Sequence, residues 1–359
     1  MPRNHMGRGT RVRVTHRTYA RASPHETHFN CNRVTIAVFP GEPGRRAMKP
    51  EVLLMGPMYP PTMESLEQAF TLHRVAQAPD RDAFLASVGE RVTAAATTAF
   101  RGMDAATMAK LPRLKVISHF GVGVDSVDVA AASARGVTVT NTPDVLTDDV
   151  ADLTLGLLIA TVRRMCEGDR FVRAGQWLKG PLPLTDTLQG KTLGIVGMGR
   201  IGRAIARRAE AFNLKVAYQG PNRKVDLLHR HYTDPVALAK DVDLLVAACP
   251  GGEATRGLVS RAVLEALGPQ GVLVNISRGS VVDEAALVEL LQQGKLGGAG
   301  LDVFANEPRV PEALFAMENV VLQPHVGSAT HPTRRAMGQL VVDNLAAFFA
   351  GKPLLTPYN

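Results

Sequence analysis

The chain has 359 residues, enough for two domains of ordinary size, and its 45% hydrophobic and 21% charged residues are typical of a soluble globular protein. The net charge of +8 is concentrated in residues 1–47, which hold nine Arg and two acidic residues, so the nearly neutral remainder has no compositional reason to bind nucleic acid. Cys31, Cys166 and Cys249 lack paired or metal-like spacing. This pattern argues against disulfides and a metal site, and it favours the reducing cytoplasm.

Residues 1–47 show no apolar periodicity and are rich in Arg, His, Thr and Pro. Three interpretations are open: a disordered tail, an Arg-rich transit peptide, or sequence upstream of a true start at Met48. We favour a disordered or non-native extension that has no fold of its own. The longest apolar run, about 153–162, is too short to span a bilayer, which needs about 20 residues.

From Glu51 onward, strand-like and helix-like segments alternate, which indicates a parallel sheet with helices on both faces. The predicted strands are 51–55, 92–100, 114–120 and 137–141, and the predicted helices are 63–70, 104–110 and 126–135. A long helix over about 147–172 follows, and its middle is apolar nearly all round, so it should be buried between domains or subunits. Residues 175–187, with the only tryptophan, Trp177, are expected to form an arm or loop.

The segment 191–203 combines a short apolar run, the pattern Gly197-x-Gly199-x-x-Gly202 and a helical continuation. Gly197 permits a tight strand-to-helix turn, Gly199 leaves room for a pyrophosphate, and Gly202 allows close packing. The start of the helix offers free N–H groups and the positive end of its dipole to a phosphate. A second strand, 214–218, lies at the expected distance, so the segment predicts a dinucleotide site.

The alternation then resumes, with strands expected at 242–248, 271–276, 298–303 and 319–322 and helices at 283–295 and about 332–350. The predicted organisation has a substrate-binding domain, 48–148 and 329–359, into which a dinucleotide-binding domain, 149–328, is inserted. The predicted class is α/β, with two doubly wound parallel sheets of the Rossmann or flavodoxin-like type.

Four polar residues stand at the ends of predicted strands or in the loops that follow them: Arg278, Asp302, Glu307 and His325. In a doubly wound sheet these loops line the ligand cleft. Arg278 suits two-pronged binding of a carboxylate, and a histidine suits acid–base chemistry near neutral pH. Glu307 could orient His325 and favour its protonated form, but the sequence alone does not place the two side chains within contact distance.

The second strand of the cofactor domain is followed by Gln219 and then by Asn222, Arg223 and Lys224. An NAD-preferring site usually has an acidic residue here for the ribose hydroxyls, whereas a neutral residue followed by cations suits a 2′-phosphate. We therefore predict that NADP(H) is preferred and NAD(H) is possible. The alternative is that Arg223 and Lys224 form only a solvated turn.

Over nearly all of residues 50–359 the chain resembles the D-isomer-specific 2-hydroxyacid dehydrogenases, in particular their glyoxylate/hydroxypyruvate and hydroxyphenylpyruvate reductase branches. The segments that carry the resemblance are Phe120–Asp125, Asn141–Asp152, the glycine motif, Asn275–Gly279, Gly298–Pro308, Pro324–Thr330 and Gly351–Pro357. Ser277 and Ser280 depart from the common pattern, and residues 1–47 have no counterpart.

The resemblance implies a catalytic trio of Arg278, Glu307 and His325. It also implies that Asp302 faces the nicotinamide amide and that the backbone N–H groups of Val122 and Gly123 receive the substrate carboxylate, beside Arg278 and His325. The full cofactor-binding set that we expect is Gly197, Gly199, Arg200, Ile201, Gly202, Asn222, Arg223, Lys224, Pro250, Thr255, Ile276, Asp302 and Gly327.

The expected activity is NADPH-dependent reduction of a small 2-oxo acid, such as glyoxylate or hydroxypyruvate, to the D-2-hydroxy acid. The alternatives are another reaction of the family, such as D-3-phosphoglycerate oxidation, or a non-enzymatic dinucleotide sensor that resembles the corepressors with this fold. We expect a homodimer that contacts neither nucleic acid nor membrane. Trp177 belongs either to the dimer contact or to ordinary core.

Overall fold

The computed structural model describes residues 48–359, in which Lys49–Asn359 form one compact unit. The predictions for residues 1–47 lie outside the described part. The unit contains two sheets, and every strand in them pairs in parallel, as expected for strands joined by helices.

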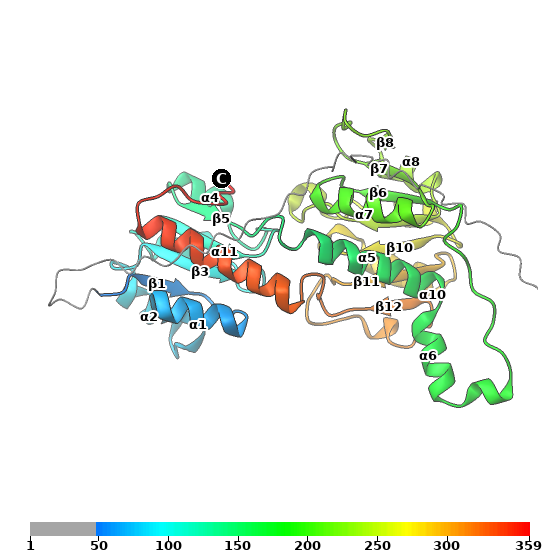
Figure 1. Ribbon diagram of the computed structural model, residues 1–359, viewed down its shortest axis with the longest axis horizontal. Coiled ribbons are helices and arrows are strands. Elements are labelled where there is room, and N and C mark those ends of the chain that lie inside the picture. The colour runs from blue at the N-terminus through cyan, green and yellow to red at the C-terminus, as the bar shows by residue number, and fades with distance from the viewer. Residues whose placement is uncertain (1–47) are drawn as a thin grey trace, which may run out of the picture. The chain divides into compact units, whose positions relative to one another are not determined.

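The first sheet has the order β2-β1-β3-β4-β5. This is the flavodoxin-like order of a doubly wound sheet. Helices α1 and α11 cover one face of it (Figure 1). Helices α2, α3 and α4 pack on the other face. The elements are β1 Glu51–Leu54, α1 Pro60–Ala69, β2 Thr71–Arg74, α2 Arg81–Val88, β3 Ala94–Thr98, α3 Ala105–Ala109, β4 Val116–Phe120, α4 Val129–Ala134, β5 Thr138–Thr140 and α11 His331–Phe349.

The second sheet has the order β12-β11-β10-β9-β6-β7-β8, the Rossmann arrangement with one more strand. Helices α5 and α7 pack on one face, in front of the sheet in Figure 1. Helices α8, α9 and α10 pack on the other face. The elements are α5 Thr147–Val162, α6 Met165–Arg173, β6 Thr192–Val196, α7 Arg200–Ala211, β7 Lys215–Gln219, β8 Arg230–Tyr232, α8 Pro235–Lys240, β9 Leu244–Ala247, α9 Arg261–Leu267, β10 Val272–Asn275, α10 Glu284–Gln292, β11 Gly298–Leu301 and β12 Val320–Leu322.

The predicted class, α/β with two parallel doubly wound sheets, is confirmed. The prediction of one helix over 147–172 is wrong, because Arg164 adopts a left-handed backbone with φ 48° and separates α5 from α6. Asp104 and Asp283, the first residues of two predicted helices, cap α3 and α10, each by accepting a backbone N–H of the first turn.

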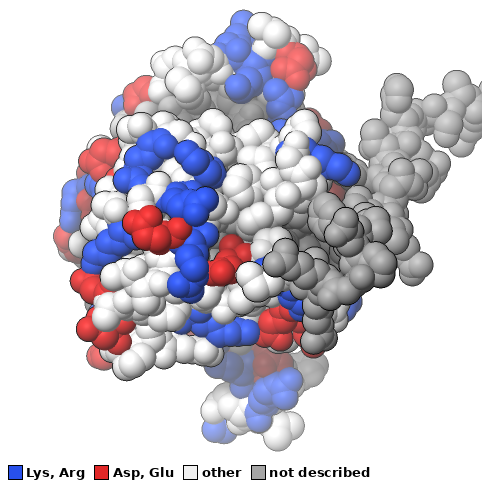
Figure 2. Space-filling model, turned by 90° about the vertical axis from the view of Figure 1, so that its left-hand side faces the viewer, with Lys and Arg blue, Asp and Glu red and all other residues white. Residues whose placement is uncertain are grey.

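The alternation of side chains along the strands places the core on both faces of each sheet. In β1, Val52 and Leu54 pack toward α1 and α11, whereas Leu53 packs toward the opposite helices. At the surface, acidic and basic side chains are intermixed on the face shown in Figure 2. Within residues 48–359, no helix combines the length and the apolar character needed to cross a membrane.

Candidate active site

A cleft of about 1110 Å³ lies where loops from the ends of both sheets meet. It is lined by the loops after β4, β6, β9 and β10 and by His325, Gly327 and Ser328. Because the carboxyl ends of parallel strands share one edge of a sheet, each sheet contributes the edge at which doubly wound folds bind ligands.

The glycine motif forms the turn from β6 into α7. Gly197 has φ 99°, and a Cβ there would lie 2.6 Å from the backbone of Cys249. A Cβ at Gly202 would lie 2.2 Å from the Gly197 carbonyl oxygen, so the helix could not pack so closely. Nothing lies within 4 Å of the corresponding position at Gly199, which leaves open space beside the helix N-terminus. This cradle suits a pyrophosphate.

The end of β7 carries no carboxylate. Gln219 is buried, and its Nε2 donates to the Thr233 carbonyl at 3.0 Å. The backbone N–H of Lys224 donates to the Tyr218 hydroxyl at 2.7 Å and so anchors the following turn. Among residues 48–359, neither Arg223 nor Lys224 forms an ion pair with an acidic side chain, and the neighbouring Asp226 is paired with Arg203.

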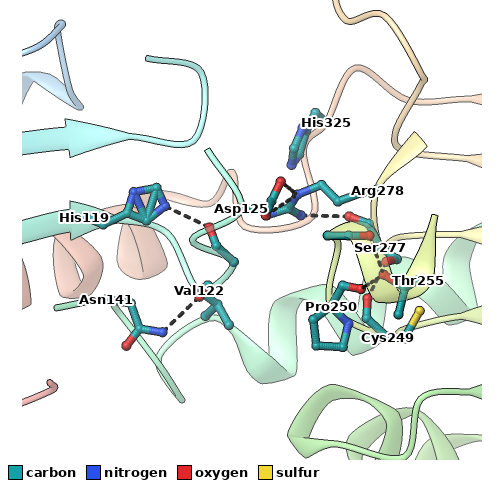
Figure 3. Close-up of polar contacts among 12 residues, drawn as sticks. His119, Val122, Asp125, Asn141, Cys249, Pro250, Thr255, Ser277, Arg278 and His325 are labelled. Carbon is teal, nitrogen blue, oxygen red and sulfur yellow. Dashed lines mark hydrogen bonds and ion pairs between the residues drawn. The ribbon is translucent and has the colours of Figure 1, made fainter. Parts of the chain in front are cut away.

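Other predicted cofactor residues lie on the same side of the cleft. Thr255 donates its hydroxyl to the Pro250 carbonyl at 2.7 Å and thereby shapes the loop after β9 (Figure 3). Ile276 contributes a buried apolar side chain to the lining of the cleft. Arg200, the first residue of α7, pairs through Nε with Asp144 at 2.8 Å.

Arg278 lies three residues after the end of β10 at Asn275, and its side chain enters the cleft between Gly123 and Gly251. Its Nε lies 3.1 and 3.2 Å from the two carboxylate oxygens of Asp125, which follows β4 in the first sheet (Figure 3). A Cβ at Gly123 would lie 2.2 Å from a guanidinium nitrogen of Arg278, and one at Gly251 would lie 2.5 Å from its Cγ. The guanidinium thus already binds a carboxylate group, as its forked geometry favours.

His325 and Glu307 form a direct pair, which the sequence did not establish. The Nδ1 of His325 lies 2.7 Å from Glu307 Oε2, while the backbone N–H of Phe304 donates to Oε1 at 3.0 Å. Burial raises the pKa of the Glu307 carboxyl, but the hydrogen bonds from His325 and Phe304 outweigh burial and leave that pKa lowered. An ionised Glu307 therefore fixes the ring and directs Nε2 away from itself.

Asp302 holds the loop that carries His325. Its two carboxylate oxygens accept the N–H groups of Val326 and Gly327 at 2.7 and 2.9 Å, and its carbonyl accepts the His325 N–H at 2.8 Å. These contacts stabilise the left-handed backbone of His325, φ 55°. Burial raises the pKa of the Asp302 carboxyl in spite of the two hydrogen bonds.

Most of the predicted residues meet in the cleft. Those that line it are Val122, Gly123, Gly197, Gly199, Arg200, Ile201, Pro250, Ile276, Arg278, Asp302, His325 and Gly327. Those that do not line it are Gly202, Asn222, Arg223, Lys224, Thr255 and Glu307. Gly202 acts through packing, and Glu307 contacts His325 from behind.

Four residues of the site received no individual role from sequence reasoning. Asp125 binds Arg278, Phe100 packs edge-on against His325 with ring centroids 5.5 Å apart, and His119 and Asn141 bond the loop after β4. Asp125 and Asn141 stood in recognised segments, but their partners are distant in sequence. No signal marked His119 or Phe100. Between residues 48 and 359, no group of three or more His, Cys, Asp or Glu could hold a metal ion.

Comparison with known proteins finds close relatives along most of the chain. Residues 155–327 match the NAD-binding domain of the D-isomer specific 2-hydroxyacid dehydrogenases. The chain is 50% identical over 306 residues to the glyoxylate/hydroxypyruvate reductase A HPR2 of Arabidopsis thaliana and to the hydroxyphenylpyruvate reductase of Plectranthus scutellarioides. Each alignment covers 85% of this chain and 98% of the relative.

A solved structure with the same fold is the NADPH-dependent glyoxylate/hydroxypyruvate reductase of Sinorhizobium meliloti in complex with NADP and malonate. It is 44% identical, with a TM-score of 0.80, over 86% of this chain and 96% of that one.

Proposed function

Because the chain belongs to the D-isomer-specific 2-hydroxyacid dehydrogenase family and is an NAD(P)-dependent 2-keto acid reductase, we propose that it reduces a small 2-oxo acid with NADPH. Glyoxylate and hydroxypyruvate are the proposed substrates, and the D-2-hydroxy acid is the product. The observation that carries the proposal is that His325, which Glu307 contacts from behind, lies in the same cleft as Arg278.

We assign dinucleotide binding to residues 149–328 and substrate binding to residues 48–148 and 329–359. The open space at Gly199 and the N-terminus of α7 support binding of the pyrophosphate. Packing of α11 against β4 supports its return to the substrate domain, where Ser118 donates to the Val341 carbonyl at 3.3 Å. When bound, the dinucleotide supplies the hydride that adds to C2 of the oxo acid.

The remaining chemistry falls to the chain's own residues. Arg278 and the N–H groups of Val122 and Gly123 hold the substrate carboxylate, and Arg278 polarises the keto oxygen. His325 donates a proton from Nε2 to that oxygen, because Nδ1 is engaged by Glu307. Asp302 keeps the His325 loop in place and lies at the proposed nicotinamide position.

The substrate proposal is tested by NADPH oxidation at 340 nm with glyoxylate, hydroxypyruvate, phenylpyruvate and pyruvate. We expect the highest kcat/KM with one of the first two substrates. A preference for phenylpyruvate would replace the proposed substrate class. Oxidation of D-3-phosphoglycerate without reduction of any oxo acid would overturn the proposed reaction.

The preference for NADPH rests on Gln219 and on the cations of the turn after β7. We expect the double variant Arg223→Ser and Lys224→Ser to raise KM for NADPH at least about tenfold, since each cation contributes a charge-assisted contact to the 2′-phosphate. KM for NADH should stay within twofold. Equal changes in KM for NADPH and NADH would show that the turn does not bind the 2′-phosphate.

We also propose a homodimer in the cytoplasm. Near α6 and the arm, four large apolar side chains are between 56% and 99% exposed in the single chain: Val172, Trp177, Leu178 and Leu184. Apolar exposure of this kind is typical of a contact surface. Light scattering at micromolar concentration should give twice the chain mass, and a monomer would remove this proposal.

A further inference from the structure

The loop Gly121–Asp125, which follows β4, has three successive carbonyl groups that are all hydrogen-bonded. The Thr142 N–H donates to the Gly121 carbonyl at 2.9 Å. The side chain of Asn141 donates to the Val122 carbonyl at 2.9 Å, and Nε2 of His119 lies 2.8 Å from the Gly123 carbonyl. Two of the three carbonyls are therefore held by side chains.

Holding a carbonyl also fixes an N–H group. In a trans peptide the N–H of the next residue points opposite to the carbonyl. The three bonds therefore set the direction of the N–H groups of Val122, Gly123 and Val124. Among the described residues none of these N–H groups has a hydrogen-bond acceptor, although the loop is half-buried. Because buried N–H groups are normally paired, these groups are suited to bind the acceptor atoms of a ligand.

The two side chains act from the side of the loop away from the reaction centre. Figure 3 shows His119 and Asn141 on one side of the loop and Arg278 and His325 on the other. Since the carbonyls are turned toward His119 and Asn141, the N–H groups face the side of Arg278. The Arg278 guanidinium lies on this side as well, where a Cβ added to Gly123 would come within 2.2 Å of one of its nitrogens.

His119 is an unusual residue to find in this position. It is fully buried in β4, and burial lowers the pKa of its ring to about 4, so the ring is neutral. Nε2 must carry the proton, because its partner is a carbonyl. Nδ1 is buried and has no hydrogen-bond partner in the described part of the chain. The unpaired Nδ1 lowers the stability of the fold, and an apolar residue here would avoid this cost. What a histidine adds at this position is the hydrogen bond from Nε2 to the Gly123 carbonyl.

We propose that His119 and Asn141 are positioning residues, which keep the carbonyls of Gly123 and Val122 turned away from the cleft so that the loop presents N–H groups to a carboxylate. The inference rests on the proposed function, in which this loop binds the substrate carboxylate. Without either donor, the peptide is free to rotate and to present a carbonyl oxygen, which repels a carboxylate.

The test compares donor-deleting with donor-keeping variants. His119→Phe and Asn141→Leu remove the donors at similar side-chain size, whereas His119→Gln keeps an N–H donor. The matched control is Ser118→Ala, the residue before His119, which is equally buried but bonds the Val341 carbonyl of α11 at 3.3 Å. The readouts are KM for glyoxylate, Kd for oxalate by calorimetry on the NADPH-loaded enzyme, and Kd for NADPH.

We expect His119→Phe and Asn141→Leu each to raise KM for glyoxylate and Kd for oxalate at least about tenfold, the value of one hydrogen bond to a charged group. His119→Gln and Ser118→Ala should stay within threefold, and Kd for NADPH within twofold throughout. If His119→Phe does not fold, Asn141→Leu carries the test, because the two donors hold different peptides.

Unchanged oxalate binding in the donor-deleting variants would overturn the proposal, and so would equal losses in Ser118→Ala or parallel losses of NADPH. A wild-type enzyme that binds oxalate but reduces no 2-oxo acid would instead overturn the proposed function, while the oxalate series would still report on the loop.

Discussion

On the wall of the cleft that the second sheet provides, functional side chains pair with other side chains. His325 pairs with Glu307, and Arg278 pairs with Asp125 across the cleft. On the wall that the first sheet provides, the proposed functional groups are backbone N–H groups, whose direction His119 and Asn141 set through the neighbouring carbonyls, while Asp125 reaches across to Arg278. In our proposal the first arrangement transfers a proton to the substrate, and the second binds the substrate carboxylate. Damage to the two walls should therefore alter different kinetic constants.

The largest effect is expected from the wall that carries His325. His325→Ala removes the proposed proton donor, so kcat should fall about 10²–10⁴-fold. Glu307→Gln keeps the shape but removes the charge, and kcat should fall about 10–10²-fold. Steady-state rates at 340 nm and NADPH binding by fluorescence measure both changes. The Kd for NADPH should not change, and undiminished turnover in both variants would remove this pair from the mechanism.

The next effect concerns Arg278, which joins the two walls through Asp125. Arg278→Lys keeps the charge but loses the fork, so kcat/KM for the oxo acid should fall about 10²-fold, the worth of two charge-assisted hydrogen bonds. Asp125→Asn leaves the guanidinium in place and should cost less than tenfold. If Asp125→Asn proves the more damaging change, the ion pair rather than the guanidinium fork is the essential element.

The smallest effect is on stability and belongs to His119. Its pKa falls from 6.5 to about 4 on folding, so between these values the unfolded chain binds a proton that the folded chain rejects. Stability is therefore lost as pH falls from 6.5 toward 4. At pH 5 this loss amounts to about 2 kcal/mol. Urea unfolding of the wild type and of His119→Gln at pH 7 and pH 5 measures this loss in the free energy of unfolding. The variant should lose less than the wild type between the two pH values. Equal losses in both proteins would contradict a neutral buried ring.

Sequence reasoning predicted the fold well where local signals agree. The glycine motif, the helix starts at Asp104 and Asp283, and the strand–helix alternation each depend on neighbours within a few residues. It failed where a single backbone conformation decides the outcome, as at Arg164, because an uninterrupted helical pattern does not reveal a left-handed residue. It also missed short elements such as β2 and α2, whose stability comes from packing on the sheet.

The sequence by itself determined that this chain has a dinucleotide cradle and that Arg278, Glu307 and His325 are the residues to examine, since strand ends and glycine spacing are local properties. Only the tertiary structure decided that Glu307 contacts His325, that Asp125 reaches Arg278 over 153 positions, and that His119 and Asn141 support the loop between them. Such contacts depend on how two sheets bring distant strand ends together. Periodicity along one strand carries no information about that arrangement.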